Sequence, residues 1–283
     1  MSLNSIEKHL LAIEQLYDIP ILNHIDIERH LNYITKFPVL TFNIPTETYV
    51  YRATTSFINE HFSSTSRISN APEHLVKNYG RVNFPQQSFF YCSENYATSY
   101  LELINYWVKN ISLGQFFYVT MGEWQTTEQI QSIIVTTPDK AKRQTIFEIS
   151  SGDAFDNKML NFNNEERAIS ELIYNKLYEW YSKPAKVGDN VYKITSSFSN
   201  KLLKAMKRFG ILNDTCIMYP SVADLKKGVN FAFEPGIIKS GKLKLIRAWR
   251  IKLIVMQKED GFYDFKEVER ELATIKDNGS LVW

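Results

Sequence analysis

Short strand-like runs, spread from residue 39 to residue 256, are the feature that most constrains the fold of this chain. Each run is rich in apolar, aromatic and β-branched residues, and turn-forming residues separate many of them. The runs cover residues 39–44, 48–53, 88–93, 115–121, 130–137, 216–221, 228–233 and 243–256. The pattern predicts a substantial β core, to which the helical segments of the chain are added as an α+β fold.

Helical patterns occupy the N-terminal segment and the middle of the chain. Residues 4–36 are expected to form two helices that pack on the main domain as an extension. The clearest helix is expected at residues 163–181, and a shorter one at residues 199–209, where Gly210 ends it. The acidic C-terminal tail is expected to form a strand and a helix on the surface.

Composition fits a globular protein of an intracellular setting. The chain has 283 residues, of which 44% are apolar and 14% aromatic, enough for a packed core. Neither a signal peptide nor about 20 consecutive apolar residues, the length of a membrane span, is found. Cys92 and Cys216 lie in apolar runs and are expected to be free thiols. We therefore expect a cytoplasmic protein without a membrane partner.

Several enzyme classes are disfavoured by the residues that the chain lacks. All five histidines lie at or before residue 74, which argues against a Ser-His-Asp or Cys-His enzyme built on the later segments. The two cysteines lack CxxC spacing and HExxH is absent, so no metal site is expected. Neither the GxGxxG dinucleotide fingerprint nor a Walker loop is present.

Charge is uneven along the chain, although the formal net charge is only +2. Residues 201–258 contain 13 Lys or Arg and 3 Asp or Glu, a local balance of +10 (13 − 3). Such a segment attracts polyanions. Because no helix-turn-helix, RNA-recognition or zinc-finger pattern accompanies it, nucleic acid is a minor alternative as a partner.

One stretch in the first half gathers residue types that suit chemistry. Gly80 and Arg81 begin a turn, with positive φ expected at Gly80, and Pro85 fixes a second bend. The aromatic run at residues 88–93 follows as a strand. A helix comes next, and it carries Glu102 beside its apolar stripe. The stretch therefore brings a guanidinium, which suits phosphate, near a carboxylate.

The helix is predicted from apolar residues that recur at helical spacing. Ser93 or Asn95 precedes it as a possible cap. The stripe consists of Ala97, Leu101, Ile104 and Val108.

A second region of interest lies between residues 216 and 233. Two strand-like runs joined by a short polar loop place Ser221 and Asn230 near strand ends, where small polar side chains often line a pocket. The alternative is that Ser221 only makes a turn after Pro220. Earlier in the chain, Arg52 lies inside a strand, where an arginine usually faces solvent unless its neighbours form an anion site.

Taken in order, these motifs resemble the RES domain, a family named for its Arg, Glu and Ser. The motifs are Tyr51-Arg52-Ala53, Gly80-Arg81-Val82-Asn83-Phe84-Pro85, Tyr91-Cys92-Ser93 with Glu102, and Tyr219-Pro220-Ser221 with Gly228-Val229-Asn230. The resemblance covers residues 47–257. Two departures are a longer segment between Glu102 and Ser221 and the absence of a glycine after Pro85.

The resemblance implies an organisation in three parts. Residues 1–46 are the N-terminal helical extension, and residues 47–258 the RES-like catalytic domain, with an enlarged insert at about 105–210. Residues 259–283 are a C-terminal tail packed on that domain. The implied fold is α+β and similar to ADP-ribosyltransferases: a mixed or antiparallel β core with flanking helices.

The resemblance also implies an activity on NAD. RES domains act as toxins of bacterial toxin–antitoxin pairs and split the nicotinamide–ribose bond, in some members by phosphorolysis. Such cleavage develops positive charge on the ribose, which a fixed carboxylate stabilises, and Glu102 is the candidate. The catalytic residues implied are Arg52, Glu102 and Ser221. The residues implied to bind NAD are Arg52, Arg81, Tyr91 and Asn230.

Each binding residue has an expected task. Arg52 and Arg81 would hold the pyrophosphate and an inorganic phosphate, and Tyr91 would pack beside the nicotinamide. Ser221 would bond to the phosphate or ribose, and Asn230 would support the loop. No cofactor is expected beyond NAD as substrate and, for phosphorolysis, phosphate.

Two alternatives remain open besides an NAD phosphorylase or glycohydrolase with a partner antitoxin. One is transfer of ADP-ribose to a macromolecule. The other is an inactive domain that binds nucleic acid or protein.

Overall fold

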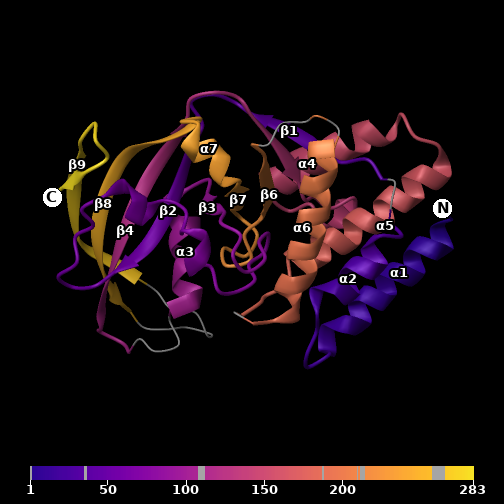
Figure 1. Ribbon diagram of the computed structural model, residues 1–283, viewed down its shortest axis with the longest axis horizontal. Coiled ribbons are helices and arrows are strands. Elements are labelled where there is room, and N and C mark those ends of the chain that lie inside the picture. The colour runs from indigo at the N-terminus through magenta and orange to yellow at the C-terminus, as the bar shows by residue number, and fades with distance from the viewer. Residues whose placement is uncertain are drawn as a thin grey trace.

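The computed structural model describes residues 2–34, 37–107, 112–186, 188–208, 210, 214–256 and 265–283. Within them, ten strands form one sheet in the order β1-β5-β6-β7-β3-β2-β4-β8-β9-β10. Strands β5 and β6 run parallel and the other neighbours antiparallel, so the sheet is mixed. Helices flank this sheet, and the predicted α+β fold is confirmed (Figure 1).

The strands have the following bounds: β1 Thr41–Ile44, β2 Tyr49–Ser56, β3 Phe90–Ser93, β4 Phe116–Thr126, β5 Ile130–Ile134, β6 Cys216–Pro220, β7 Val229–Phe233, β8 Leu243–Val255, β9 Phe265–Ile275 and β10 Leu281–Val282. The helices are α1 Leu3–Gln15, α2 His24–Leu31, α3 Tyr96–Trp107, α4 Ile146–Met159, α5 Asn164–Tyr181, α6 Asn190–Arg208 and α7 Pro235–Lys239. Among the described residues, no helix is both long enough and apolar enough to cross a membrane.

Two chain segments, one from β1 to β2 and one from β4 to β5, run antiparallel to each other and link the two halves of the sheet. Strand β1 pairs with β5 and β2 pairs with β4, so each pair continues the other around a bend. The bend is held by Thr126, whose Oγ1 donates to the carbonyl of Pro45 at 2.7 Å and accepts from the amide of Thr48 at 2.9 Å. Beyond it, β2 and β3 share only the pair Tyr51↔Ser93. The sheet therefore opens between β2 and β3.

The N-terminal helices share a core with the central strands. Helix α1 contacts α2 and α5, and α2 contacts α6, so these four helices form one layer beside the sheet (Figure 1). Their apolar faces pack with Ile217, Tyr219 and Ala232 of β6 and β7 in one buried cluster. The C-terminal strands β8 and β9 lie on the opposite side of the molecule (Figure 1).

The C-terminal tail was expected to form a strand and a helix. The prediction of the helix is wrong, because the described part of the tail forms the strands β9 and β10. Strand β9 pairs with β8 in a register that places Glu271 opposite Arg250 and Glu269 opposite Lys252. Opposite charges on directly paired residues stabilise a sheet. Acidic residues of the tail therefore complement basic residues of β8. Val108, Phe209 and residues 257–264, which include the predicted boundary at 258, lie outside the described residues.

Helix α6 begins at Asn190, nine residues before the predicted start at residue 199 (199 − 190). Its first half is rich in Ser and Thr, which favour turns in an isolated sequence. In the structure two of these hydroxyls donate to the carbonyl four residues earlier, from Thr195 to Val191 at 3.1 Å and from Ser199 to Thr195 at 2.8 Å. Buried packing thus keeps a helix where local propensity is weak.

Candidate functional site

A cavity of about 890 Å³ lies where β2 and β3 separate, and its size suits a nucleotide. Strands β2, β3 and β7, helix α3, the loop after β6 and the α5–α6 connection supply its walls. Five of the six predicted site residues line it: Arg52, Arg81, Tyr91, Glu102 and Asn230. The sixth, Ser221, is buried behind Glu102 and bonds to it.

Glu102 is held by two donors at one of its oxygens. Ser221 Oγ donates to Glu102 Oε1 at 2.6 Å, and Asn230 Nδ2 donates to the same oxygen at 2.5 Å. Ser93 Oγ donates to Asn230 Oδ1 at 2.7 Å, and this contact orients the amide so that its nitrogen faces Glu102. Among the described residues, no donor bonds to Glu102 Oε2. That oxygen is therefore available to a ligand.

Local structure explains why α3 presents Glu102 to the cavity. Asn95 caps the helix, because its Oδ1 accepts from the amide of Thr98 at 2.8 Å, as one of the two predicted caps. The amide of Ala53 donates to Ser99 Oγ at 2.8 Å, which fixes the helix on β2. Ser99 and Glu102 are three residues apart and so share the face of the helix that lines the cavity.

Arg52 turns inward from β2 rather than toward solvent. Its Nη1 donates to the carbonyl of Tyr91 at 2.5 Å, and its guanidinium lies 5.2 Å from the centre of the Phe90 ring. Its Nε is buried without a hydrogen-bond partner. Burial lowers the pKa of Arg52, but a guanidinium stays charged at neutral pH. The opening between β2 and β3 thus holds a partly buried cation, with a buried Nε, beside the cavity.

Arg81 is already committed to the backbone of α5. Its Nη1 donates to the carbonyl of Trp180 at 3.1 Å, and its Nη2 donates to the carbonyl of Lys183. Its guanidinium also lies 5.2 Å from the centre of the Tyr192 ring. These bonds satisfy carbonyls at the end of the helix. Arg81 therefore connects the loop at residues 80–83 to the end of α5. Because both of its terminal nitrogens donate to carbonyls, fewer of its N–H groups are free for a phosphate than the sequence suggested.

Tyr91 is fixed by the same loop. Its hydroxyl donates to Asn83 Oδ1 at 2.7 Å and accepts from the amide of Val82 at 3.0 Å. Burial raises the pKa of Tyr91, so the hydroxyl stays protonated. The positive φ expected at Gly80 is wrong, since Gly80 is not among the glycines with positive φ. Glycine is needed for space: a Cβ there would lie 2.4 Å from Asn83 Oδ1 and 2.9 Å from the Tyr91 hydroxyl.

The loop at residues 221–228, here called the cavity loop, covers Glu102 from the β6 side. Ser221 is fully buried, and its Oγ accepts from the amide of Asp224 at 3.2 Å. Asp224 in turn accepts from Thr98 Oγ1 of α3 at 2.6 Å. A Cβ at Gly228 would lie 2.1 Å from Thr98 Oγ1, so the contact between loop and helix needs glycine there.

Several residues of the site were not predicted. The insert supplies one wall of the cavity through residues between α5 and α6: Pro184, Ala185, Lys186 and Asp189, followed by Tyr192 of α6. No motif in the sequence marks these positions. Ser93 and Thr98 were also missed as parts of the site, although Ser93 stands in a quoted motif and Thr98 lies four residues before Glu102 on the same helical face.

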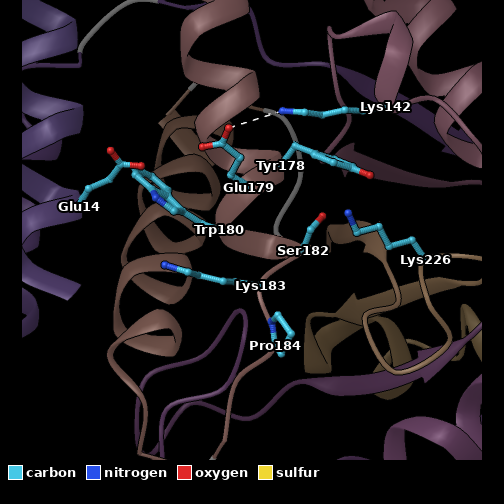
Figure 2. Close-up of a pocket in the computed structure, with 9 residues that line it drawn as sticks. All are labelled: Glu14, Lys142, Tyr178, Glu179, Trp180, Ser182, Lys183, Pro184 and Lys226. Carbon is cyan, nitrogen blue, oxygen red and sulfur yellow. Dashed lines mark ion pairs between the residues drawn. The ribbon is translucent and has the colours of Figure 1, made fainter. Parts of the chain in front are cut away.

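A second cavity, of about 370 Å³, lies beside the first and shares Pro184 with it (Figure 2). The end of α5 forms one wall, where Glu179 pairs with Lys142 at 3.6 Å. Lys226 of the cavity loop reaches this cavity, with its Nζ 5.0 Å from the centre of the Tyr178 ring. None of the predicted site residues lines it.

In the described part of the basic segment at residues 201–258, several cations contact groups of the protein itself. Lys207 pairs with Glu234 at 2.9 Å, and Lys242 lies 3.6 Å from Asp214. Arg250 is 8% exposed, and its Nη2 donates to the carbonyl of Phe57 at 2.9 Å. Several of the cations that could attract a polyanion are thus engaged within the protein.

No protein-family model matches the sequence, and no curated protein matches it either. The described residues hold no group of three or more His, Cys, Asp or Glu side chains placed to bind a metal ion.

Proposed function

We propose that this protein is a RES-like, NAD-degrading enzyme that cleaves the bond between nicotinamide and ribose, with phosphate or water as the acceptor. The observation that carries the proposal is the environment of Glu102. One carboxylate oxygen is held by Ser221 and Asn230, and the other has no donor among the described residues, in a cavity that is also lined by the partly buried cation of Arg52. A carboxylate fixed in this way is oriented before a ligand arrives.

The proposed reaction breaks the glycosidic bond of the nicotinamide ribose. The electron pair of that bond leaves with the nicotinamide nitrogen, which becomes neutral, and positive charge develops on C1 and the ring oxygen of the ribose. Glu102 Oε2 stabilises this charge or bonds to a ribose hydroxyl. An oxygen of phosphate then bonds to C1 to give ADP-ribose 1″-phosphate, or an oxygen of water bonds to C1 and releases a proton to solvent to give ADP-ribose; nicotinamide is the other product in both cases.

Arg52 is the proposed anchor for the anionic part of the ligand. Among the described residues, its guanidinium donates to one acceptor, the carbonyl of Tyr91, and its Nε has no hydrogen-bond partner. A phosphate beside it would give the buried charge a counterion. Arg81, bound to two carbonyls, acts mainly by positioning the loop next to Tyr91.

Glu102→Gln tests the carboxylate directly. We expect this isosteric variant to lose about 1,000-fold in kcat, because removing one charge-stabilising group at a transition state has effects of that order. Nicotinamide release from NAD is the measurement. The matched control is Glu128→Gln, which changes an exposed carboxylate outside the site and should leave the rate unchanged. A Glu102→Gln protein with the wild-type rate would sink the proposal.

The acceptor is identified by the products. The reaction is run with and without phosphate. A phosphorolytic enzyme yields ADP-ribose 1″-phosphate when phosphate is present, whereas a glycohydrolase yields ADP-ribose in both reactions. NAD labelled in the adenine separates the alternative function, since transfer to a macromolecule would leave the label in the protein or nucleic acid fraction.

We further propose that this protein is a cytoplasmic toxin that a protein partner neutralises. Cells that express the wild-type chain alone should lose NAD and stop growing, whereas cells with the Glu102→Gln chain should do neither. Strong expression of an unmodified chain with normal NAD levels would contradict a toxin.

A further inference from the structure

Two consecutive residues of the cavity loop adopt left-handed backbone conformations. The φ angle is 47° at Leu225 and 67° at Lys226. Neither is Gly, Asn or Asp, the residues that tolerate this region best. Leu225 is also 64% exposed, so burial of its side chain does little to offset the strain. The free protein thus holds an apolar residue in an unfavourable conformation that its own packing does not explain.

Hydrogen bonds on both sides of Leu225 maintain this conformation. The amide of Lys226 donates to the carbonyl of Ser221 at 2.7 Å, and the amide of Lys227 donates to the carbonyl of Asp224 at 2.8 Å. The Asp224 carboxylate is fixed to α3 through Thr98. Hydrogen bonds therefore hold the loop in this conformation, and one of them is accepted by Ser221, which also bonds to Glu102.

The two strained residues line different cavities. Leu225 lines the larger cavity together with Val222 and Ala223, whereas Lys226 lines the smaller one beside Tyr178 (Figure 2). The left-handed turn separates the two side chains in this way. Strain held at the rim of a binding cavity is commonly tied to ligand contact.

We propose that Leu225 is a specificity-determining residue that packs against the flat heteroaromatic ring of the nucleotide bound in the larger cavity. This inference rests on the proposed function, because it takes NAD as the ligand. An exposed apolar side chain gains free energy when a ring removes it from water. NAD carries two such rings, nicotinamide and adenine, and either satisfies the same chemistry.

The test uses substitutions for which strain and ligand contact predict opposite changes. Leu225→Gly and Leu225→Asn both suit a left-handed backbone, so the melting temperature should stay the same or rise. Both remove the apolar contact, so the Kd for ligand should rise about tenfold, the effect of losing roughly half the burial of a leucine. Leu225→Met, which keeps an apolar side chain, should bind as the wild type does.

Two probes distinguish the rings. ADP-ribose lacks nicotinamide and is titrated against the otherwise wild-type protein, and NAD is titrated in a Glu102→Gln background so that it is not consumed. Equal weakening of both probes assigns Leu225 to adenine, and weakening of NAD alone assigns it to nicotinamide. In turnover by the otherwise active protein, KM should rise about tenfold with kcat little changed, the pattern of uniform binding.

Lys226→Gly is the matched control for loop flexibility. It relieves the neighbouring strain and leaves Leu225 in place, so its Kd should equal that of the wild type. If Leu225→Gly has the wild-type Kd, or if Lys226→Gly weakens ligand binding as much as Leu225→Gly does, the role of Leu225 is overturned while the proposed function stands. A Glu102→Gln protein and a wild-type protein that bind neither probe would overturn the proposed function and this inference with it.

Discussion

Ser93 is 2% exposed at the end of β3, and its hydroxyl begins a chain of hydrogen bonds that ends at Glu102. Through Asn230 it decides which side of the amide faces the carboxylate, because an amide that rotated would present its oxygen to Glu102. Ser93 touches no ligand in this scheme. It is a positioning residue, and its influence on catalysis passes through Asn230.

Ser93→Ala should lower kcat about fivefold with KM for NAD nearly unchanged, since it removes one oriented hydrogen bond worth roughly 1 kcal/mol. The measurement is nicotinamide release at saturating and at low NAD. Ser132→Ala is a matched control, because Ser132 is an equally buried strand serine that donates to the carbonyl of Phe42. If both variants lose activity to the same extent, general destabilisation explains the loss and Ser93 has no positioning role.

At the scale of elements, α4 shows a helix that the sequence did not predict. It starts with a capping box in which Thr145 and Glu148 exchange hydrogen bonds, and Gly152 lies in its middle. Glycine disfavours a helix, but a Cβ there would lie 2.2 Å from Arg143 Nε. The side chain of Arg143 is 5% exposed and donates to both carboxylate oxygens of Asp156, at 2.8 and 2.9 Å. A tertiary ion pair therefore explains the glycine.

Asp156→Asn should lower the free energy of unfolding by about 1 kcal/mol at pH 7, at the low end for such a pair because Asp156 is partly exposed and screened by solvent. The hydrogen bond from Arg143 lowers the pKa of Asp156. A lowered pKa contributes stability above the unfolded value of about 3.9, and this contribution is lost as pH falls through the folded value. The difference from wild type should thus shrink below about pH 4.

Urea unfolding at pH 7, 5 and 3 measures this difference. Asp153→Asn is the control, since Asp153 lies 3.3 Å from the same arginine with its side chain 65% exposed. It should change the free energy of unfolding by less than about 0.5 kcal/mol. A destabilisation by Asp156→Asn that did not depend on pH would contradict an ionic role for Asp156.

At the scale of the whole molecule, the N-terminal segment belongs to the core. Within residues 1–46, β1 is a strand of the sheet and pairs with β5. Seven apolar residues of this segment are buried in the cluster that includes β6 and β7: Ile6, Leu10, Ile13, Leu22, Ile27, Leu31 and Ile34. In addition, His24 Nδ1 lies 3.0 Å from the hydroxyl of Tyr79, next to the loop that carries Arg81.

Removal of residues 1–46 should therefore prevent folding. Burial of each such side chain contributes about 1.5–3 kcal/mol, and together they match or exceed the roughly 5–15 kcal/mol by which a domain is stable. Circular dichroism and binding of a hydrophobic dye would report the loss of tertiary structure. A truncated protein with a cooperative thermal transition would show that residues 1–46 are only an extension.

Much of the fold could be read from local pattern. Residues 163–181 were predicted as a helix that the structure places at Asn164–Tyr181, and residues 228–233 as a strand that runs from Val229 to Phe233. In both, apolar spacing and capping or turn residues agree with the tertiary structure. Prediction failed for the first nine residues of α6 and for the helix expected in the tail, where packing and pairing with β8 override weak or misleading local preference.

The sequence by itself determined the residue types of the candidate site and the elements that carry them. Only the tertiary structure decided which of them meet, because the contact from Ser221 to Glu102 joins residues 119 positions apart. It also decided that Arg52 turns inward, since β2 and β3 share a single pair, and that Arg81 is bound to α5. These outcomes depend on long-range pairing and on where each backbone carbonyl lacks a partner, neither of which local sequence encodes.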